Sequence, residues 1–298
     1  MSTVEKPVLL IELSLLALLA VLWGSSYLFI KVAVAEIPPV TLIAARVSIA
    51  ALFLFAVLSW RQEKLPRDTK TWRKLLLQAI FNSIGAWTIL AWGQQFVDSG
   101  LASVLNSTSP IFVFLFTIIV TRHETTNGLK LFGACLGLLG VALIVGVDVL
   151  AGLGQQVAGQ LAAITGAILY ACAAIYGKQF SNLTAAATAT GTMIWASVVL
   201  VPASLIFEQP WLLDPSMEAV SAALVLAIFC TGCALLIYFR LVKTLGSMGV
   251  ASQAYLRAGV GVLLGVILLG EQITLVIGIG LLAAIVGVAA INIPKRGQ

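Results

Sequence analysis

The chain is built from long apolar segments that short charged loops interrupt. Of its 298 residues, 60% are hydrophobic and 10% are charged, a composition far outside that of soluble domains. Splitting the sequence at charges, prolines and polar clusters predicts ten segments of about twenty residues, the length that a helix needs to cross a bilayer. The segments are 9–33, 39–60, 73–95, 100–121, 129–147, 158–178, 186–207, 218–241, 248–270 and 274–293. We expect an all-α integral membrane protein with ten transmembrane helices.

The seventeen lysine and arginine residues are distributed unevenly among the expected loops. Fourteen lie on one side of the membrane, whereas the loops of the other side carry only acidic residues. Cytoplasmic loops carry the basic excess, so both termini are expected in the cytoplasm. The net charge of +5 therefore reflects orientation, and no nucleic acid partner is expected. The fourteen are Lys6, Arg61, Lys64, Arg67, Lys70, Arg73, Lys74, Arg122, Lys130, Lys178, Arg240, Lys243, Lys295 and Arg296.

Motifs of enzymes, cofactor sites and cleaved leaders are missing or weak. The expected spans contain no paired acids, no serine with histidine and no phosphate-binding loop, so we expect no enzyme, no cofactor and no metal site. Cys230 and Cys233 form a CxxC without a histidine, which predicts two small helix residues. The run Val8–Ile30 is too long for a signal peptide, so we expect a retained first helix.

The sequence repeats itself at about half its length. Leu22–Lys31 resembles Leu169–Lys178, and Gly100–Ser103 resembles Gly249–Ser252. Three residues recur at one offset of 147 positions: Glu124 with Glu271, Gly133 with Gly280, and Gly140 with Gly287. Because five spans are an odd number, residues 1–148 and 149–298 are expected to form inverted five-helix repeats. Such repeats are typical of secondary transporters, whose substrate site lies near the midplane.

Glycines recur on one face of the fifth and tenth expected spans. They are Gly133, Gly137, Gly140, Gly278, Gly280 and Gly287. Small residues at this spacing allow two helices to approach closely. They predict either packing within one chain or a dimer, so the sequence leaves monomer and homodimer open.

Four short motifs resemble those of the EamA-type drug/metabolite transporters. They are Trp23-Gly24-Ser25-Ser26 followed by Lys31, Ala44-Ala45-Arg46, Ser107-Thr108-Ser109-Pro110 and Leu268-Leu269-Gly270-Glu271. Within that family the chain most resembles the bacterial exporters of aromatic and other amino acids. The stretch Arg122-His123-Glu124-Thr125 departs from the family pattern, because small residues are missing before the glutamate. The resemblance implies an exporter in a bacterial cytoplasmic (inner) membrane.

Arg257 is the leading candidate for substrate binding. It lies about nine residues into the ninth expected span, roughly 14 Å deep at 1.5 Å per residue. Gln253 lies one turn earlier on the same face, and Tyr255 lies between them. No acidic residue is expected at that depth, and a guanidinium suits bidentate recognition of a carboxylate. Arg257 is predicted either to bind a substrate carboxylate or to be held structurally by helix-end carbonyls.

Further candidates come from the third and fourth expected spans. Asn106, Ser107 and Thr108 precede Pro110, and a proline frees a backbone carbonyl. The helix there either opens toward the substrate or forms a packing kink. Asn82, with Trp87 about one turn beyond, either lines the same cavity or bonds across helices.

Two aromatic and two basic residues complete the set. Trp23 and Tyr170 are related by the repeat, and they either stack on substrate or pack in the core. Lys31 and Arg46 are expected nearer the outer surface, snorkelling to the lipid headgroups with Glu36 as a partner. Alternatively they form an outer vestibule for anions, since the outer loops contain no other cation.

These features predict a transporter that exports small metabolites, in particular amino acids, by alternating access around a midplane cavity. Its partners are then the small-molecule substrate and membrane lipid. Without a buried carboxylate to carry protons, uniport or exchange is favoured over proton coupling. Two alternatives stay open: an exporter of lipophilic cationic drugs, and a non-transporting membrane sensor or scaffold.

Overall fold

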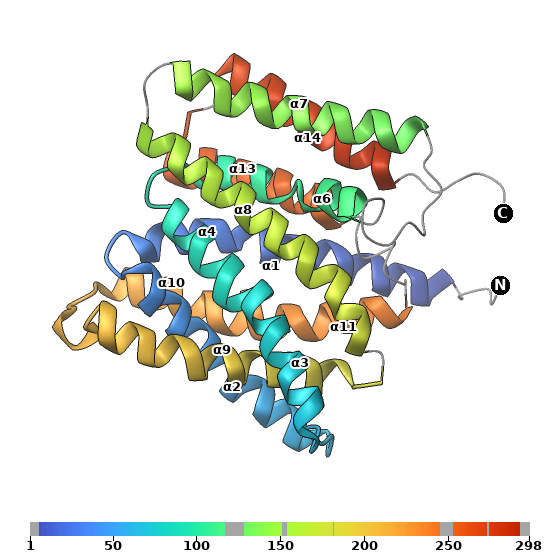
Figure 1. The fold of residues 1–298 in the computed structure, drawn as a ribbon, viewed down its shortest axis with the longest axis vertical. Coiled ribbons are helices and arrows are strands. Elements are labelled where there is room, and N and C mark those ends of the chain that lie inside the picture. Colours follow the sequence, from blue (N-terminus) through green and yellow to red (C-terminus); the bar gives the residue numbers. More distant parts are fainter. Residues whose placement is uncertain are drawn as a thin grey trace.

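The computed structural model describes residues 6–116, 128–150, 154–180, 182–244, 253–272 and 274–292, and all regular elements in these ranges are helices (Figure 1). The α-helices are α1 (Lys6–Val34), α2 (Pro39–Trp60), α3 (Thr69–Ala79), α4 (Thr88–Gly93), α5 (Ser99–Asn106), α6 (Ser109–Phe116), α7 (Gly128–Leu150), α8 (Gly154–Gly177), α9 (Ala185–Phe207), α10 (Met217–Ala227), α11 (Ala234–Thr244), α13 (Gln253–Leu269) and α14 (Leu275–Asn292). The π-helices are η1 (Ile80–Trp87) and η5 (Ile228–Cys233), and the short 3₁₀ turns are η3 (Lys178–Phe180) and η4 (Pro210–Leu212). The Arg122–Thr125 stretch and Gly249–Ser252 lie outside the described residues.

Seven helical segments in these ranges are long and apolar enough to cross a membrane. They are Leu10–Val34, Pro39–Trp60, Thr69–Gly93, Ser99–Phe116, Gly154–Gly177, Ala185–Phe207 and Met217–Tyr238. Three shorter apolar stretches, Leu131–Gly140, Leu256–Leu269 and Gly278–Gly287, fall in the remaining predicted spans. Large apolar side chains such as Leu52, Ile206 and Leu275 are exposed, as on surfaces that contact lipid. The chain is therefore a multi-pass, all-helical membrane protein.

Local sequence signals explain where several helices begin. α2 begins at Pro39, and proline suits a first turn because its missing N–H would have no helical partner. Thr184 precedes α9, and its hydroxyl accepts a hydrogen bond from the Ala187 N–H at 3.2 Å. The bounds of these two helices agree with the predicted spans 39–60 and 186–207 to within one residue.

Helices that the sequence repeat relates pack against each other. α7 packs along α14 in the upper part of Figure 1, and α2 packs along α9 in its lower part. An offset of 147 residues carries Pro39–Trp60 onto 186–207, which is α9, and Gly128 onto Leu275, where α14 begins. The same offset relates α1 to α8, and α5 and α6 to α13. Accordingly, α1 packs on α13, and α8 packs on α5 and α6. The arrangement of helices therefore follows the internal repeat.

The glycine faces of α7 and α14 meet within the chain. A Cβ at Gly140 would lie 2.6 Å from the Gly280 carbonyl oxygen, and one at Gly287 would lie 2.5 Å from that of Gly133. A side chain cannot fit at such distances, so glycine lets the two backbones touch. Packing within one chain accounts for these glycines.

Two π-helical segments lie at positions that the repeat relates. η1 separates α3 from α4, and η5 separates α10 from α11. Shifting η1 by 147 residues gives 227–234, which encloses η5. A π-helical turn re-aims the side chains around it and is frequent at functional sites. Nothing in the sequence pattern predicted these segments.

Candidate functional site

Polar side chains from both repeats gather in the interior of the helix bundle. We define the central polar cluster as Tyr27, Arg46, Trp87, Asn106, Ser107, Tyr170, Thr231 and Arg257. The two π-helical segments supply Trp87 and Thr231. The cluster therefore lies where both regular helices are interrupted.

Arg46 is buried at the centre of this cluster, with only 4% of its surface exposed. Its Nε donates to Thr231 Oγ1 at 2.8 Å, and its guanidinium carbon lies 3.9 Å from the Trp87 ring centroid. The Thr231 hydroxyl donates its own proton to the Leu226 carbonyl oxygen, which leaves its oxygen free to accept from Arg46. Stacking on the indole offsets part of the cost of burying the charge.

The predicted position of Arg46 near the lipid headgroups was wrong. Its side chain points into the bundle toward η1 and η5, rather than snorkelling outward. The rotation of α2 about its axis decides this, and it depends on partners far away in the sequence. Thr231, for example, is 185 positions from Arg46.

Arg257 is half-buried on α13 and lies beside the break between α5 and α6. Its Nε and Nη2 are 3.4 and 3.3 Å from Ser107 Oγ, long distances for hydrogen bonds to a guanidinium. Ser107 donates its own proton to the Ser103 carbonyl oxygen at 2.7 Å. In the part of the chain that the structure describes, neither Arg257 nor Arg46 forms an ion pair with a carboxylate.

Two amide oxygens beside the arginines lack hydrogen-bond partners among the described residues. Asn106 donates from Nδ2 to Tyr27 Oη at 2.7 Å, but its buried Oδ1 accepts nothing. Gln253 Oε1, one turn from Arg257, is also buried without a donor. Tyr170 lies within electrostatic range of both arginines and of Tyr27. The cluster thus combines unpaired cations with unpaired acceptors.

Three other predicted residues, Trp23, Thr108 and Asn82, have contacts outside this network. Trp23 packs on Tyr238 with ring centroids 5.3 Å apart. The Thr108 hydroxyl donates to the Leu105 carbonyl oxygen at 2.6 Å, within its own helical turn. Asn82 donates to Ser83 at 3.3 Å, and the Tyr255 side chain lies outside the described residues.

Lys31 is bound to the end of a helix. Its Nζ donates to the carbonyl oxygens of Gln94 at 2.9 Å and Val97 at 2.7 Å, just beyond the C-terminus of α4, where cations are favoured. Glu36, its expected partner, instead accepts from Ser216. The pKa of the nearby Asp98 carboxyl is raised above its usual value, because burial and the Glu271 carboxylate outweigh the opposite effect of Lys31.

Three carboxylates in the loops expected outside join the two halves of the chain. Glu36 accepts from the Ser216 N–H at 2.6 Å, before α10. Glu208 accepts from the Val40 and Thr41 N–H groups of α2 at 3.0 and 2.6 Å. Glu271 accepts from the Ser99 and Gly100 N–H groups of α5 at 2.6 and 2.9 Å. Each carboxylate thus neutralises a helix N-terminus from the other half, and we call these three the outer carboxylate contacts.

Glu12 corrects the expectation that the spans hold no buried carboxylate. Only 1% of its surface is exposed, and it forms an ion pair with Arg240 at 2.8 Å. Thr244 donates to its other oxygen at 2.9 Å. The Arg240 side chain, which belongs to α11, is more than half exposed and lies between the Glu12 carboxylate and the surface. This pair joins the two halves near the basic end of the molecule.

Sequence comparisons place the chain among transporters. The model of the EamA-like transporter family matches residues 10–146 and again residues 157–293. The "Uncharacterized transporter YoaV" of Bacillus subtilis (strain 168) is 27% identical over 268 residues, which cover 90% of this chain and 91% of that protein. The "Uncharacterized inner membrane transporter YedA" of Escherichia coli (strain K12) is 27% identical over 277 residues, covering 93% and 89%.

A solved crystal structure has a similar fold. It matches 93% of this chain and 94% of its own, with a TM-score of 0.64 and 18% sequence identity. At that identity the match bears on the fold alone. The two family matches begin 147 residues apart, the same offset that the sequence repeat shows.

Proposed function

Because this chain belongs to the EamA-like transporter family and is a multi-pass membrane transporter, we propose that it exports amino acids or similar small metabolites from the cytoplasm. In this proposal it lies in a bacterial inner membrane. The relative YedA is named as an inner membrane transporter, which supports this location. Ten spans form two inverted five-helix repeats, and both termini are cytoplasmic. Substrate binds at the central polar cluster and reaches the two sides alternately.

In the described part of the chain, two arginines without a carboxylate partner lie near two amide oxygens without a donor, one in the central polar cluster and one on the neighbouring Gln253. This combination supports an amino acid as substrate. Arg46 and Arg257 have no carboxylate partner among the described residues, and they can donate to a carboxylate. Asn106 Oδ1 and Gln253 Oε1 are buried acceptors that can receive an ammonium group. A zwitterion supplies both charges at once, so it satisfies all four side chains.

The arrangement argues against export of lipophilic cations. Such a substrate needs an open aromatic face or a carboxylate. One face of Trp87 is already covered by Arg46, and two arginines would repel a second cation. The family assignment likewise weighs against a non-transporting sensor or scaffold.

Alternating access requires contacts that break in turn on the two sides of the membrane. The outer carboxylate contacts serve this role on one side, and the Glu12–Arg240 ion pair serves it on the other. The Glu12 carboxylate accepts hydrogen bonds from Arg240 and Thr244, and neither residue belongs to the central polar cluster. The proposal therefore keeps uniport or exchange as the transport mode.

Uptake into proteoliposomes tests the proposal. We expect saturable uptake of labelled phenylalanine or methionine above the leak of empty vesicles. Replacing Arg257 with alanine should lower this uptake roughly 10- to 100-fold, since a charge-assisted hydrogen bond contributes about 1.5–3 kcal/mol.

Arg61→Ala is the matched control, because Arg61 is an exposed arginine outside the central polar cluster. It should transport like the unmodified protein. The proposal fails if no amino acid enters above leak, or if both variants reduce uptake equally.

A further inference from the structure

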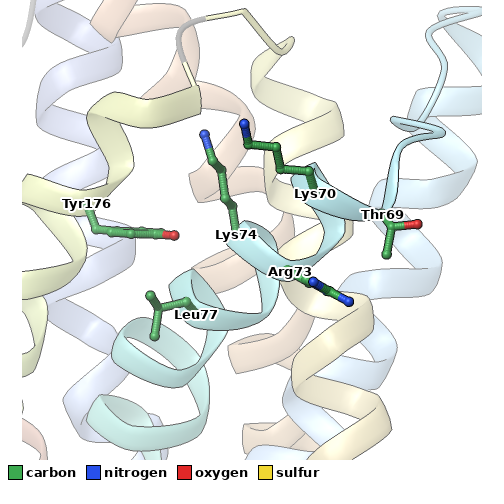
Figure 2. Close-up of a pocket in the computed structure, with 6 residues that line it drawn as sticks. All are labelled: Thr69, Lys70, Arg73, Lys74, Leu77 and Tyr176. Carbon is green, nitrogen blue, oxygen red and sulfur yellow. The ribbon is translucent and has the colours of Figure 1, made fainter.

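A pocket of about 830 Å³ opens at the basic end of the seam between α3 and α8. It is lined by Thr69, Lys70, Arg73, Lys74, Leu77 and Tyr176. Figure 2 shows Lys70 and Lys74 extending on one side of α3, with the Tyr176 hydroxyl directed toward them from α8. Three basic residues and one neutral hydroxyl thus line the pocket, with the Arg73 guanidinium directed to the other side of α3 from Tyr176.

Contacts between α3 and α8 lie between the pocket and the central polar cluster. One turn deeper, Gln78 Nε2 donates to the Ala173 carbonyl oxygen at 3.2 Å, which joins α3 to α8. Phe81 packs edge-on against Tyr176 with centroids 6.2 Å apart, and Tyr176 packs likewise on Phe180 at 6.0 Å. These contacts lie between the pocket and the central polar cluster, so the role of the pocket is separate from substrate binding; its place on the cytoplasmic side rests on the orientation in the proposal above.

The three cations of the pocket have no acidic partner among the described residues. Lys70, Arg73 and Lys74 form no ion pair there. The nearby carboxylate of Asp68 accepts from the Thr71 N–H at 2.7 Å as the N-cap of α3. Uncompensated cations at close spacing favour an anionic ligand with several acceptor oxygens.

The sequence of α3 changes from basic to apolar along the pocket. Lys70, Arg73 and Lys74 occupy its first turns, whereas Leu77 and Ile80 follow and are 37% and 42% exposed. An exposed apolar strip directly below a basic pocket matches a molecule with an anionic head and a hydrocarbon tail. Basic pockets between membrane helices at the cytoplasmic side bind such headgroups.

We propose that this pocket binds the phosphate headgroup of an anionic phospholipid of the cytoplasmic leaflet. Lys70 and Lys74 contact the phosphate oxygens, Arg73 adds a third positive charge at the edge of the pocket, and Tyr176 donates to the headgroup. The acyl chain lies along Leu77 and Ile80. Occupancy of this site at the cytoplasmic end of α3 then depends on the amount of anionic phospholipid in the membrane.

Native mass spectrometry of the delipidated full chain, titrated with dioleoyl phosphatidylglycerol, tests this site. We expect one tightly retained lipid per chain. Lys70→Gln with Lys74→Gln should weaken its affinity about 30-fold, at roughly 1 kcal/mol for each basic residue lost. Tyr176→Phe, which keeps the ring contacts with Phe81 and Phe180, should weaken it by about threefold.

Lys64→Gln with Arg67→Gln is the matched control, because it removes the same charge from the loop that precedes α3 without touching the pocket. It should change the affinity less than twofold. Equal loss in both double variants would overturn the site in favour of diffuse charge attraction. Equal binding of glycerol phosphate, which lacks acyl chains, would instead assign the pocket to a free phosphate ester. Equal retention of phosphatidylcholine would also overturn the proposal.

Discussion

Replacing Arg46 with methionine is expected to lower amino acid uptake about 100-fold while leaving the protein at least as stable to heat. Arg46 is a buried cation that donates a hydrogen bond to Thr231, and methionine has a similar length and packs well on aromatic rings. Replacing a buried charge by an apolar side chain of similar volume is often neutral or stabilising. Its retention in the native chain then reflects binding of a charged substrate.

The Arg46 experiment combines proteoliposome uptake with a thermal unfolding curve of the same preparation. Arg46→Lys is the companion variant: it keeps the charge but loses the planar fork, so we expect a loss of about tenfold. Normal uptake by Arg46→Met would show that the guanidinium does not bind substrate. Collapse of Arg46→Met during purification would show that the arginine is structural.

Replacing Glu271 with alanine is expected to open the side of the molecule that carries the outer carboxylate contacts. Glu271 accepts from two N–H groups of α5, a helix of the other half. Losing a capping contact costs about 1 kcal/mol, and losing the charge at the helix N-terminus adds up to about 1 kcal/mol. The open population should therefore increase by roughly 5- to 30-fold.

Thiol labelling from outside can measure this opening. Ser103 is fully buried on α5, one turn beyond Gly100, and a cysteine there reports exposure of the interior. In a background whose four native cysteines are alanine, a membrane-impermeant thiosulfonate should modify Ser103→Cys roughly 5- to 30-fold faster when Glu271 is alanine. Glu218→Ala, which removes an exposed acid of the same side, should leave the rate unchanged. If the two acidic variants label alike, the contact does not control access.

Much of the helical framework was predictable from the sequence, because apolar length and loop charge are properties of consecutive residues. The bounds predicted for α2 and α9 agree with the structure, and the repeat offset reappears in the pairing of helices. The prediction that Arg257 binds substrate was likewise made from depth in a single span, and it stays a prediction. That reasoning needs only the position of one residue along one helix.

The position of Arg46 and the burial of Glu12 could not be predicted in the same way. Each depends on how a helix is rotated toward a partner in the other half, Thr231 for Arg46 and Arg240 for Glu12. A single sequence does not encode that rotation as a local pattern. The outer carboxylate contacts escaped prediction for the same reason, since each joins a loop to a helix that starts more than 160 residues away.

The most direct test of the central polar cluster compares phenylalanine with phenethylamine, its decarboxylated amine, in uptake by the unmodified protein. If Arg46 and Arg257 bind a carboxylate, phenylalanine should enter saturably, while phenethylamine should show no carrier-dependent uptake at the same concentration. Saturable uptake of the amine at an equal or greater rate would contradict the account, because the two arginines would then have no anionic group to bind.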